Sequence, residues 1–226
     1  PVTEKYKVPM VEAEGASRSR FTQGYKYMFA VLSTSEYYLA PVLDLIAQRA
    51  KAGLKSPSDL RIGMAFENDG FSLDVRAGVL DVAKKYGMKI VIDDKLPADL
   101  SDMSATLTKF KALKPDILLV SGHSKGAATA ARQIEEMKIN ASAISITHCE
   151  AAKVHVKFPK SANGILCPTQ WLTNLPNSEP IFGNAQKYDG DFKKAYPEYN
   201  TGIPYQTAQA SAAVLVFKDA FERANS

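Results

Sequence analysis

The sequence predicts an α/β fold in which parallel strands alternate with helices. β-rich segments begin near residues 61, 89, 116 and 142, and segments with helical periodicity lie between them. Strands connected through single helices pair in parallel, and the helices then cover both faces of the sheet. After residue 169 the pattern changes to helix following helix, which indicates a second structural unit.

The N-terminal elements precede this alternation. Strands are expected at residues 8–13 and 25–33, on the two sides of a Gly-Ala-Ser loop. A helix is expected at 36–53, because apolar residues from Leu39 to Ile46 recur at the spacing of one helical face.

The central elements follow in order along the chain. Residues 72–87 predict a helix, because Val75 and Val79 share one face and Gly87 supplies a stop signal. The other expected elements are strands at 60–66, 89–94, 117–120, 141–147 and 164–169, and helices around 107–113 and at 127–137.

The C-terminal helices suggest a discontinuous first domain. Helical patterns at 185–195 and 213–221 have no strands of their own, and only residues 1–32 could supply a sheet for them. We therefore expect a first lobe made of 1–32 and 169–226, with a second lobe, 33–168, inserted between its halves.

Composition excludes several classes of protein. Hydrophobic residues make up 46% of the chain, as in a globular domain with a core, and the net charge is +4 from 28 basic and 24 acidic residues. No nucleic-acid module accompanies these charges, and no apolar run approaches the roughly 18 residues that span a bilayer. We expect neither nucleic-acid binding nor membrane insertion. The chain begins at Pro1 without a leader pattern, which suggests a processed form or a fragment.

The two cysteines, Cys149 and Cys167, do not form a metal-binding motif, because no Cys-x-x-Cys pair and no suitably spaced histidine accompany them. We expect no metal and no cofactor. Each cysteine lies near the end of a predicted strand, so a disulfide is geometrically possible, but two buried free thiols are the favoured expectation.

The segment SGHSKG places Ser124 in a Gly-x-Ser-x-Gly pattern between a strand and a helix, as in the nucleophile turn of α/β-hydrolases. Such enzymes need an acid and then a histidine well downstream. The two histidines that follow, His148 and His155, come too soon to leave room for the intervening elements. Asp69 lies in a suitable loop, but no second acid is expected to meet it. We therefore expect no enzyme.

Ligand binding is the better hypothesis for the loops that follow the predicted strands. These loops, at 66–71, 121–126, 145–150 and 166–171, carry aromatic or small polar residues. Open parallel sheets bind ligands at the carboxyl ends of their strands.

Several segments resemble the type I periplasmic solute-binding proteins of ABC importers, in the branched-chain amino acid (Leu/Ile/Val-binding) class. They are VPMVEAEGAS, FENDGFSLDVRAGVLDVAKKYGMKIV, LTKFKALKPDILLVSGHSKGAATAARQIEEMKI and PYQTAQASAAVLVFKDAFERA. The resemblance implies a periplasmic-binding-protein-like I fold: two Rossmann-like lobes with parallel sheets, joined by crossover hinges. Family members are longer, so the chain resembles their middle portion, and we expect residues 1–226 alone to bind ligand weakly or not at all.

The resemblance also implies a ligand-binding site. Gly15, Ala16 and Ser17 match a loop that holds the ligand carboxylate, and Phe71 matches an aromatic residue that closes over the ligand. His123 stands where amino-acid binders commonly have an aromatic residue. The family's ammonium-binding acid aligns with Thr147, so either Glu150 reaches back or the ligand has no ammonium group.

Gln170 and Trp171, with Tyr205 and Gln206, resemble a subgroup that accepts aromatic or other small carboxylates. The predicted ligand-binding set is Gly15, Ala16, Ser17, Phe71, His123, Thr147, Glu150, Trp171 and Tyr205.

The resemblance implies a periplasmic or extracytoplasmic protein, secreted or lipid-anchored as a precursor. It would capture a small carboxylate, either a branched-chain amino acid or an aromatic or other organic acid, between two lobes that close. Its partner would be the membrane permease of an ABC importer. A ligand-sensing domain of a signalling protein with the same fold remains an alternative, because a fold does not fix its output.

Overall fold

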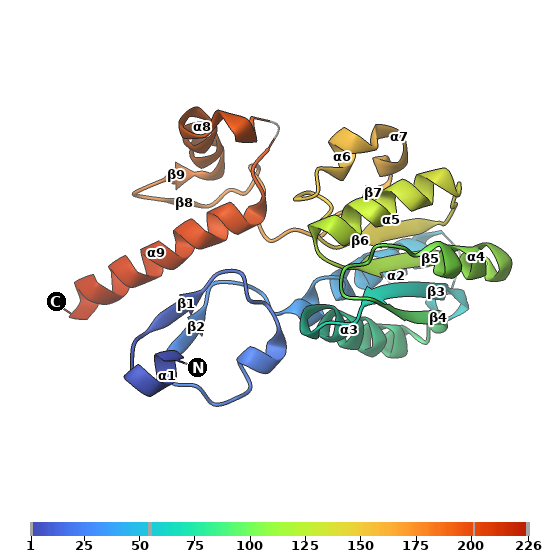
Figure 1. Cartoon of the computed structure of the whole chain (residues 1–226), viewed down its shortest axis with the longest axis horizontal. Helices are drawn as coiled ribbons and strands as arrows, with labels where there is room; N and C mark the ends of the chain where they lie inside the picture. The colour runs from blue at the N-terminus through green and yellow to red at the C-terminus, as the bar shows by residue number, and fades with distance from the viewer. Residues whose placement is uncertain (1, 54–55, 201, 225–226) are drawn as a thin grey trace. The chain divides into compact units, whose positions relative to one another are not determined.

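The computed structural model describes residues 2–53, 56–200 and 202–224 (Figure 1). The chain folds as two compact units. Unit 1 consists of Pro1–Ala16, Arg20–Ser33 and Thr169–Ser226, and unit 2 consists of Ser17–Ser19 and Thr34–Pro168.

Unit 2 contains the predicted parallel sheet. Its five strands lie in the order β4-β3-β5-β6-β7, and every neighbouring pair is parallel. The strands are β3 (Arg61–Glu67), β4 (Lys89–Leu96), β5 (Ile117–Ser121), β6 (Ala143–Ile146) and β7 (Ile165–Leu166). All five expected strands are confirmed, although β7 is shorter than the predicted 164–169.

The central strands are almost entirely buried because helices cover both faces of the sheet. Every residue of β5 is buried, as is every residue of β3 after Arg61. The helices of unit 2 are α2 (Ala40–Ala52), α3 (Gly70–Tyr86), α4 (Ser104–Leu113), α5 (Ser124–Glu136), α6 (Val154–Lys157) and α7 (Pro159–Ala162). Its short 3₁₀ turns are η2 (Ser35–Tyr37) and η3 (Pro57–Asp59). A third turn, η1 (Arg18–Arg20), begins in unit 2 and ends at Arg20 of unit 1.

The two faces of the sheet have separate helical layers (Figure 1). On one face, Phe110 of α4 and Ala130 of α5 belong to the same buried cluster as Leu118 and Val120 of β5. On the other face, α2 packs against α3, which contacts β3 and β5. This arrangement confirms the predicted α/β architecture.

Local signals at the ends of α3 agree with the sequence pattern. Asp69 caps its N-terminus, because Oδ1 accepts a hydrogen bond from the Ser72 amide at 2.8 Å. Gly87 ends the helix in the left-handed conformation at φ 70°, which glycine adopts without steric cost. Within the helix, Gly78 lies directly against the backbone of η2, so that a Cβ there would meet the Glu36 carbonyl oxygen at 1.9 Å.

Unit 1 consists of short strands and longer helices. Its parallel pair, β1 (Met10–Glu12) and β2 (Met28–Ala30), confirms two expected strands in shortened form. Helices α8 (Ala185–Ala195) and α9 (Tyr205–Ala224) confirm the C-terminal helices. The sequence did not predict the helix α1 (Val2–Tyr6), the hairpin of β8 (Ser178–Glu179) and β9 (Gly183–Asn184), the turn η4 (Pro197–Tyr199), or α6 and α7 in unit 2.

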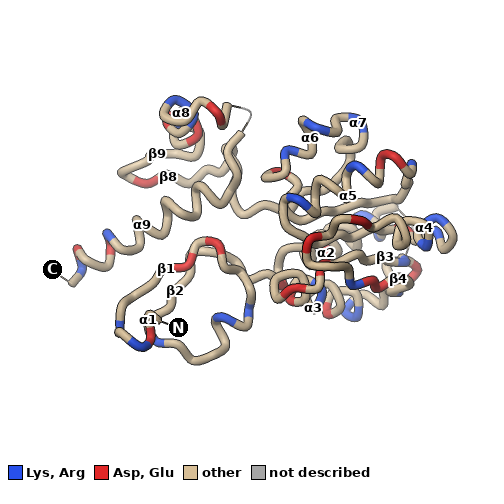
Figure 2. The backbone as a smooth tube through the Cα atoms, in the orientation of Figure 1, with Lys and Arg blue, Asp and Glu red and all other residues tan. Residues whose placement is uncertain are grey.

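Basic and acidic residues are mixed over the helices (Figure 2). On α8, Lys187 pairs with Asp191 and Lys193 with Asp189, each four residues apart. Exposed pairs of this kind each stabilise a helix by only about 0.3–0.5 kcal/mol. Among the described helices, none combines the length and the apolar character needed to cross a membrane.

Candidate ligand-binding site

The strand order of unit 2 places a topological switch point between β3 and β5. The chain passes from β3 to β4 on one side and then crosses to β5 on the other. In open α/β sheets the crevice at the carboxyl ends of such strands is the usual ligand site. The residues at this position are Glu67, which ends β3, and Ser121, which ends β5.

Four aromatic and imidazole rings gather at this edge of the sheet. Phe71, in the first turn of α3, lies 5.5 Å from His123 and 5.1 Å from His148 between ring centroids. Tyr38 meets Phe71 edge to face at 5.1 Å. We call Tyr38, Phe71, His123 and His148 the ring cluster. Such rings offer apolar faces with polar edges to a flat ligand.

Two carboxyl groups lie beside His123. One ligand atom from each of Glu67, Asp69 and His123 lies within 4.8 Å of the other two. Asp69 Oδ2 lies 3.4 Å from His123 Nε2, and the His123 amide donates to Glu67 Oε2 at 3.3 Å. The expectation that no second acid meets Asp69 is therefore wrong, because Glu67 at the end of the same strand meets it.

These three groups differ in their readiness to ionise. Burial, and then hydrogen bonding to Asp69, raises the pKa of Glu67 to about 7. Burial acts to raise the pKa of Asp69, but hydrogen bonds from His123 and Ser72 outweigh it and hold that pKa below its ordinary value. Hydrogen bonding to Asp69 raises the pKa of His123. At mildly acidic pH these directions favour a protonated Glu67, an ionised Asp69 and an imidazolium at His123.

Two glycines make room for the Glu67 carboxyl group. A Cβ at Gly122 would meet Glu67 Oε1 at 2.6 Å, and a Cβ at Gly126 would meet it at 2.5 Å. Glu67 itself is only 1% exposed. The Gly-x-Ser-x-Gly pattern therefore accommodates a buried acid at the start of α5, with Ser124 between the two glycines.

Thr147 and His148 fix the adjoining loop after β6. Thr147 is fully buried, and its hydroxyl accepts from the Gly122 amide at 3.0 Å and donates to the Gly122 carbonyl at 2.8 Å. His148 Nδ1 lies 3.0 Å from the same carbonyl oxygen. Burial lowers the pKa of His148, which favours its neutral form. Thr147 thus fixes the backbone at Gly122, next to His123.

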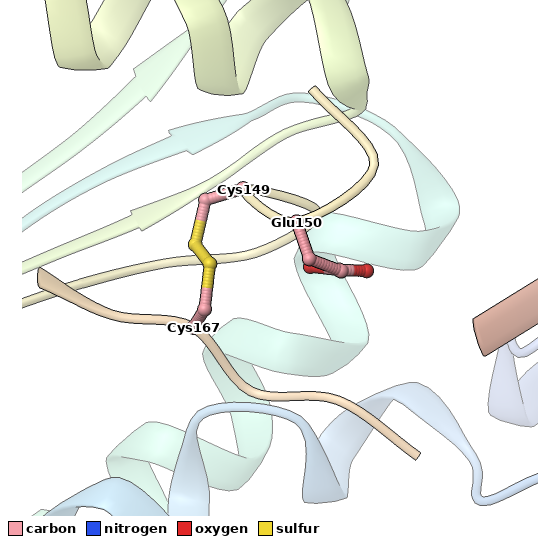
Figure 3. Close-up of side chains that lie close together, drawn as sticks. All are labelled: Cys149, Glu150 and Cys167. Atoms are coloured by element: carbon pink, nitrogen blue, oxygen red, sulfur yellow. A yellow bond between two sulfur atoms is a disulfide. The ribbon is translucent and has the colours of Figure 1, made fainter. Parts of the chain in front are cut away.

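Cys149 and Cys167 form a disulfide, so the favoured expectation of two free thiols is wrong (Figure 3). Cys149 follows β6 and Cys167 follows β7, and these neighbouring strands bring the two residues to a Cα separation of 5.7 Å. The sequence spacing alone could not indicate this, because it depends on the pairing of β6 with β7.

Glu150 lies beside the disulfide (Figure 3). Both of its carboxylate oxygens are buried, and neither has a hydrogen-bond partner among the residues that the structure describes. Burial raises the pKa of Glu150 to about 7. An acid in this position accepts either a proton or an external cation, because an unpaired buried charge is costly.

The donors of the Gly-Ala-Ser loop are engaged within the chain. In unit 1, the Gly15 amide donates to Glu12 Oε1 at 2.9 Å and the Ala16 amide donates to the Glu14 carbonyl at 2.9 Å. In unit 2, the Ser17 hydroxyl donates to Asp74 Oδ2 at 2.8 Å. It also lies 3.3 Å from the carbonyl oxygen of Gly70, the residue before Phe71.

Trp171 and Tyr205 lie in unit 1. Trp171 packs edge to face on Tyr188 at 5.7 Å and lines a cavity of about 390 Å³ with residues of α8, α9 and the β8–β9 hairpin. Tyr205, the first residue of α9, is buried. Gln170, beside Trp171, accepts a hydrogen bond from the side-chain amide of Gln209 at 2.7 Å.

Unit 2 therefore brings together two predicted residues, Phe71 and His123, and bonds Thr147 to Gly122, the residue before His123. Tyr38, Glu67, Asp69 and His148 complete the arrangement but were absent from the predicted set. The signal for Glu67 was a charged residue directly after the apolar run 62–66. The signal for His148 was its place two residues after the end of β6.

Ser124 is an exposed residue at the start of α5. Within residues 2–53, 56–200 and 202–224, no hydrogen bond joins its hydroxyl to a histidine or a carboxylate. Two groups of potential metal ligands occur in the same ranges. One is Glu67, Asp69 and His123; the other is Cys149, Glu150 and Cys167, whose sulfur atoms are joined to each other and cannot coordinate as thiolates.

The comparison with protein families identifies the chain. The family model of the periplasmic binding proteins matches residues 1–226. The chain belongs to this family. This family assignment confirms the expectation that the chain is not an enzyme.

Individual relatives are distant in sequence. The Leu/Ile/Val-binding protein homolog 8 of Brucella abortus is 23% identical over 136 residues, which cover 60% of this chain and 34% of the relative. The leucine binding protein of Thermotoga maritima has a TM-score of 0.78 at 20% identity, covering 100% of this chain and 60% of its own.

A solute binding protein of Rhodopseudomonas palustris, in complex with 3,4-dihydroxybenzoic acid, has a TM-score of 0.79 at 15% identity. This match covers 99% of the chain and 58% of that protein. The chain thus spans less than two thirds of the length of these relatives, and the structural matches confirm the predicted fold.

Proposed function

We propose that this periplasmic binding protein captures a small carboxylate outside the cytoplasm and delivers it to the permease of an ABC importer. The observation that carries the proposal is the ring cluster at the switch point of the sheet, with ionisable groups beside it. The proposal includes the expectation from the sequence that two lobes close over the ligand.

The ring cluster suits binding of a ligand that is apolar on its faces. Phe71 and His123 are near neighbours on adjoining loops, and Tyr38 backs Phe71. Burial of one aromatic or aliphatic group against such rings contributes about 1.5–3 kcal/mol. A carboxylate partner then adds orientation and specificity.

Two classes of ligand fit different features of the unit. An aromatic acid fits the ring cluster, as the dihydroxybenzoic acid held by the Rhodopseudomonas relative suggests. A branched-chain amino acid would bring an ammonium group, and Glu150 is the acid that the sequence analysis predicts for it. The leucine binding protein of Thermotoga supports this second class.

A thermal-shift screen of the natural full-length protein tests the proposal. The ligands are benzoate, 3,4-dihydroxybenzoate, leucine and valine. A ligand present at a hundred times its Kd stabilises the folded state by about 2.7 kcal/mol, which raises Tm by several degrees. Absence of any rise with all four ligands would contradict the proposal.

Two variants connect binding to the site. Phe71→Ala should weaken binding by roughly tenfold or more, because it removes a ring that the ligand would cover. Phe221→Ala is the matched control, since Phe221 is 59% exposed on α9.

Glu150→Gln should weaken binding of leucine and spare benzoate if Glu150 receives an ammonium group. Delivery is measured as ligand-dependent stimulation of ATP hydrolysis by the importer in proteoliposomes.

A further inference from the structure

His123 differs from the other polar donors near the ring cluster. The Ser17 hydroxyl is committed to Asp74, and the Thr147 hydroxyl is committed to Gly122. The His123 ring uses Nε2 toward Asp69, and its side chain is 59% exposed. In the described part of the chain, its Nδ1 makes no hydrogen bond.

We propose that His123 is the carboxylate subsite of unit 2. Its imidazolium, held from the Nε2 side by Asp69, donates from Nδ1 to the carboxylate of an aromatic acid whose ring packs against Phe71 and His148. This inference rests on the proposed function and assigns it a ligand class and an anion-binding residue.

The charges around His123 are consistent with an anion only when Glu67 carries a proton. The groups that face His123 are Asp69 from the β3–α3 loop, Glu67 from β3, and the rings of Phe71 and His148. With Glu67 and Asp69 both ionised, the cluster would repel a carboxylate. With Glu67 protonated, Asp69 and the imidazolium balance each other, and the ligand meets no excess negative charge.

The burial of Glu67 favours its protonated form beside His123. Its carboxyl group lies against Gly122 and Gly126, and the His123 amide donates to it. Glu67 is too deeply buried to reach a ligand, so it acts as a positioning residue through His123 and Asp69. Burial raises its pKa to about 7, which supports a protonated state at and below neutral pH.

The spacing of the rings fits a flat ligand. The ring centroids of His123, Phe71 and His148 lie 5.1–5.6 Å apart, and their planes are inclined by 34–50°. A planar acid can therefore pack against Phe71 while its carboxylate reaches the edge of the His123 ring. A branched aliphatic side chain would use the apolar surface but not this planar geometry.

Binding of an anion at His123 should be coupled to proton exchange in a definite direction. A bound anion stabilises the protonated forms of His123 and Glu67, so the protein should take up protons as it binds benzoate near pH 7. A cation or metal ion at the same carboxyl groups would release protons instead. The sign of the exchange therefore distinguishes the two kinds of occupant.

The experiment is isothermal titration of the natural full-length protein with benzoate at pH 7, in buffers of different ionisation enthalpy. We expect net proton uptake, unchanged by a chelator. His123→Gln should weaken binding about tenfold or more, the value expected for a charge-assisted hydrogen bond. His155→Gln, a change at an exposed histidine on α6, should leave binding unchanged.

Glu67→Gln tests the positioning role of Glu67 without removing its side chain from the core, because glutamine has nearly the same size and does not titrate. We expect this variant to bind benzoate, to lose most of the proton uptake, and to retain more of its affinity at pH 8 than the wild type does. Proton release, loss of binding with a chelator, or full affinity in His123→Gln would overturn the inference. Binding of leucine without any binding of aromatic acids would also overturn it and leave the proposed function standing.

Discussion

Thr147 and Gly122 are joined by two hydrogen bonds through a single hydroxyl group. Thr147 Oγ1 accepts from the Gly122 amide at 3.0 Å and donates to its carbonyl at 2.8 Å. The two residues follow the neighbouring strands β6 and β5, and the histidines of the ring cluster come next in each loop. One buried hydroxyl thus sets the spacing between His123 and His148.

Replacing Thr147 with valine should destabilise unit 2 by about 1–3 kcal/mol, because both backbone groups of Gly122 lose a partner in a buried place. Urea denaturation measures the change. Thr147→Ser is the matched control, since it keeps the hydroxyl and loses only a methyl group. Equal destabilisation by serine and valine would show that the methyl group, and not the hydrogen bonds, matters.

Two helical glycines should respond to alanine in opposite ways. Gly78→Ala places a Cβ 1.9 Å from the Glu36 carbonyl oxygen, so we expect a loss of at least about 1–3 kcal/mol as α3 moves away from η2. Gly190→Ala on α8 meets nothing within 4 Å and should stabilise that helix by about 0.5–1 kcal/mol. Thermal unfolding of both variants checks the contrast. A stabilising Gly78→Ala would contradict the close contact.

The sequence predicted the sheet of unit 2 well because its elements carry strong local signals. The apolar residues of β5 and the Gly87 stop signal identify a buried strand and a helix end without tertiary information. The short elements were missed for the converse reason. α6 and α7 have four residues each, too few to show a periodicity, and their formation depends on packing against α5.

The sequence predicted a residue of the candidate site only where that residue lay in a recognisable loop motif. Phe71 and His123 were found in this way. Glu67 was missed because its role depends on Gly122 and Gly126, which approach it only after β3 and β5 pair. Tyr38 was missed because it precedes a helix in a different part of the chain and reaches Phe71 through the packing of η2 on α3.

Loss of the disulfide should weaken unit 2 without abolishing its fold. Cys149 and Cys167 are 18 residues apart in sequence, and closing a loop of this length contributes about 3 kcal/mol in the chain-entropy model. The double variant Cys149→Ala/Cys167→Ala should therefore lose about 2–4 kcal/mol in urea denaturation. A reducing agent should lower the stability of the wild type to a similar extent and leave the double variant unchanged. A reductant effect on the double variant would point to another cause.

Buried Glu67 should make the stability of unit 2 depend on pH. Its folded pKa of about 7 lies above the ordinary 4.5, so between these values the folded state binds more protons than the unfolded state. The free energy of unfolding therefore falls as pH rises through this window, by up to about 1.4 kcal/mol per pH unit for one group. Glu150, raised to about 7 by burial, acts in the same direction.

Glu67→Gln should flatten this slope, because glutamine keeps the size of the buried side chain and does not titrate. Denaturation by urea at pH 5, 6 and 7 measures it, and Glu150→Gln should remove a further part. Asp81→Asn is the matched control, since Asp81 is exposed on α3 and its replacement likewise turns one carboxyl group into an amide. If Asp81→Asn flattened the slope as much as Glu67→Gln did, net charge and not the buried acid would explain the pH dependence. If Glu67 causes the pH dependence, the proton that stabilises folded unit 2 also neutralises the acid beside His123 and so favours binding of an anion there.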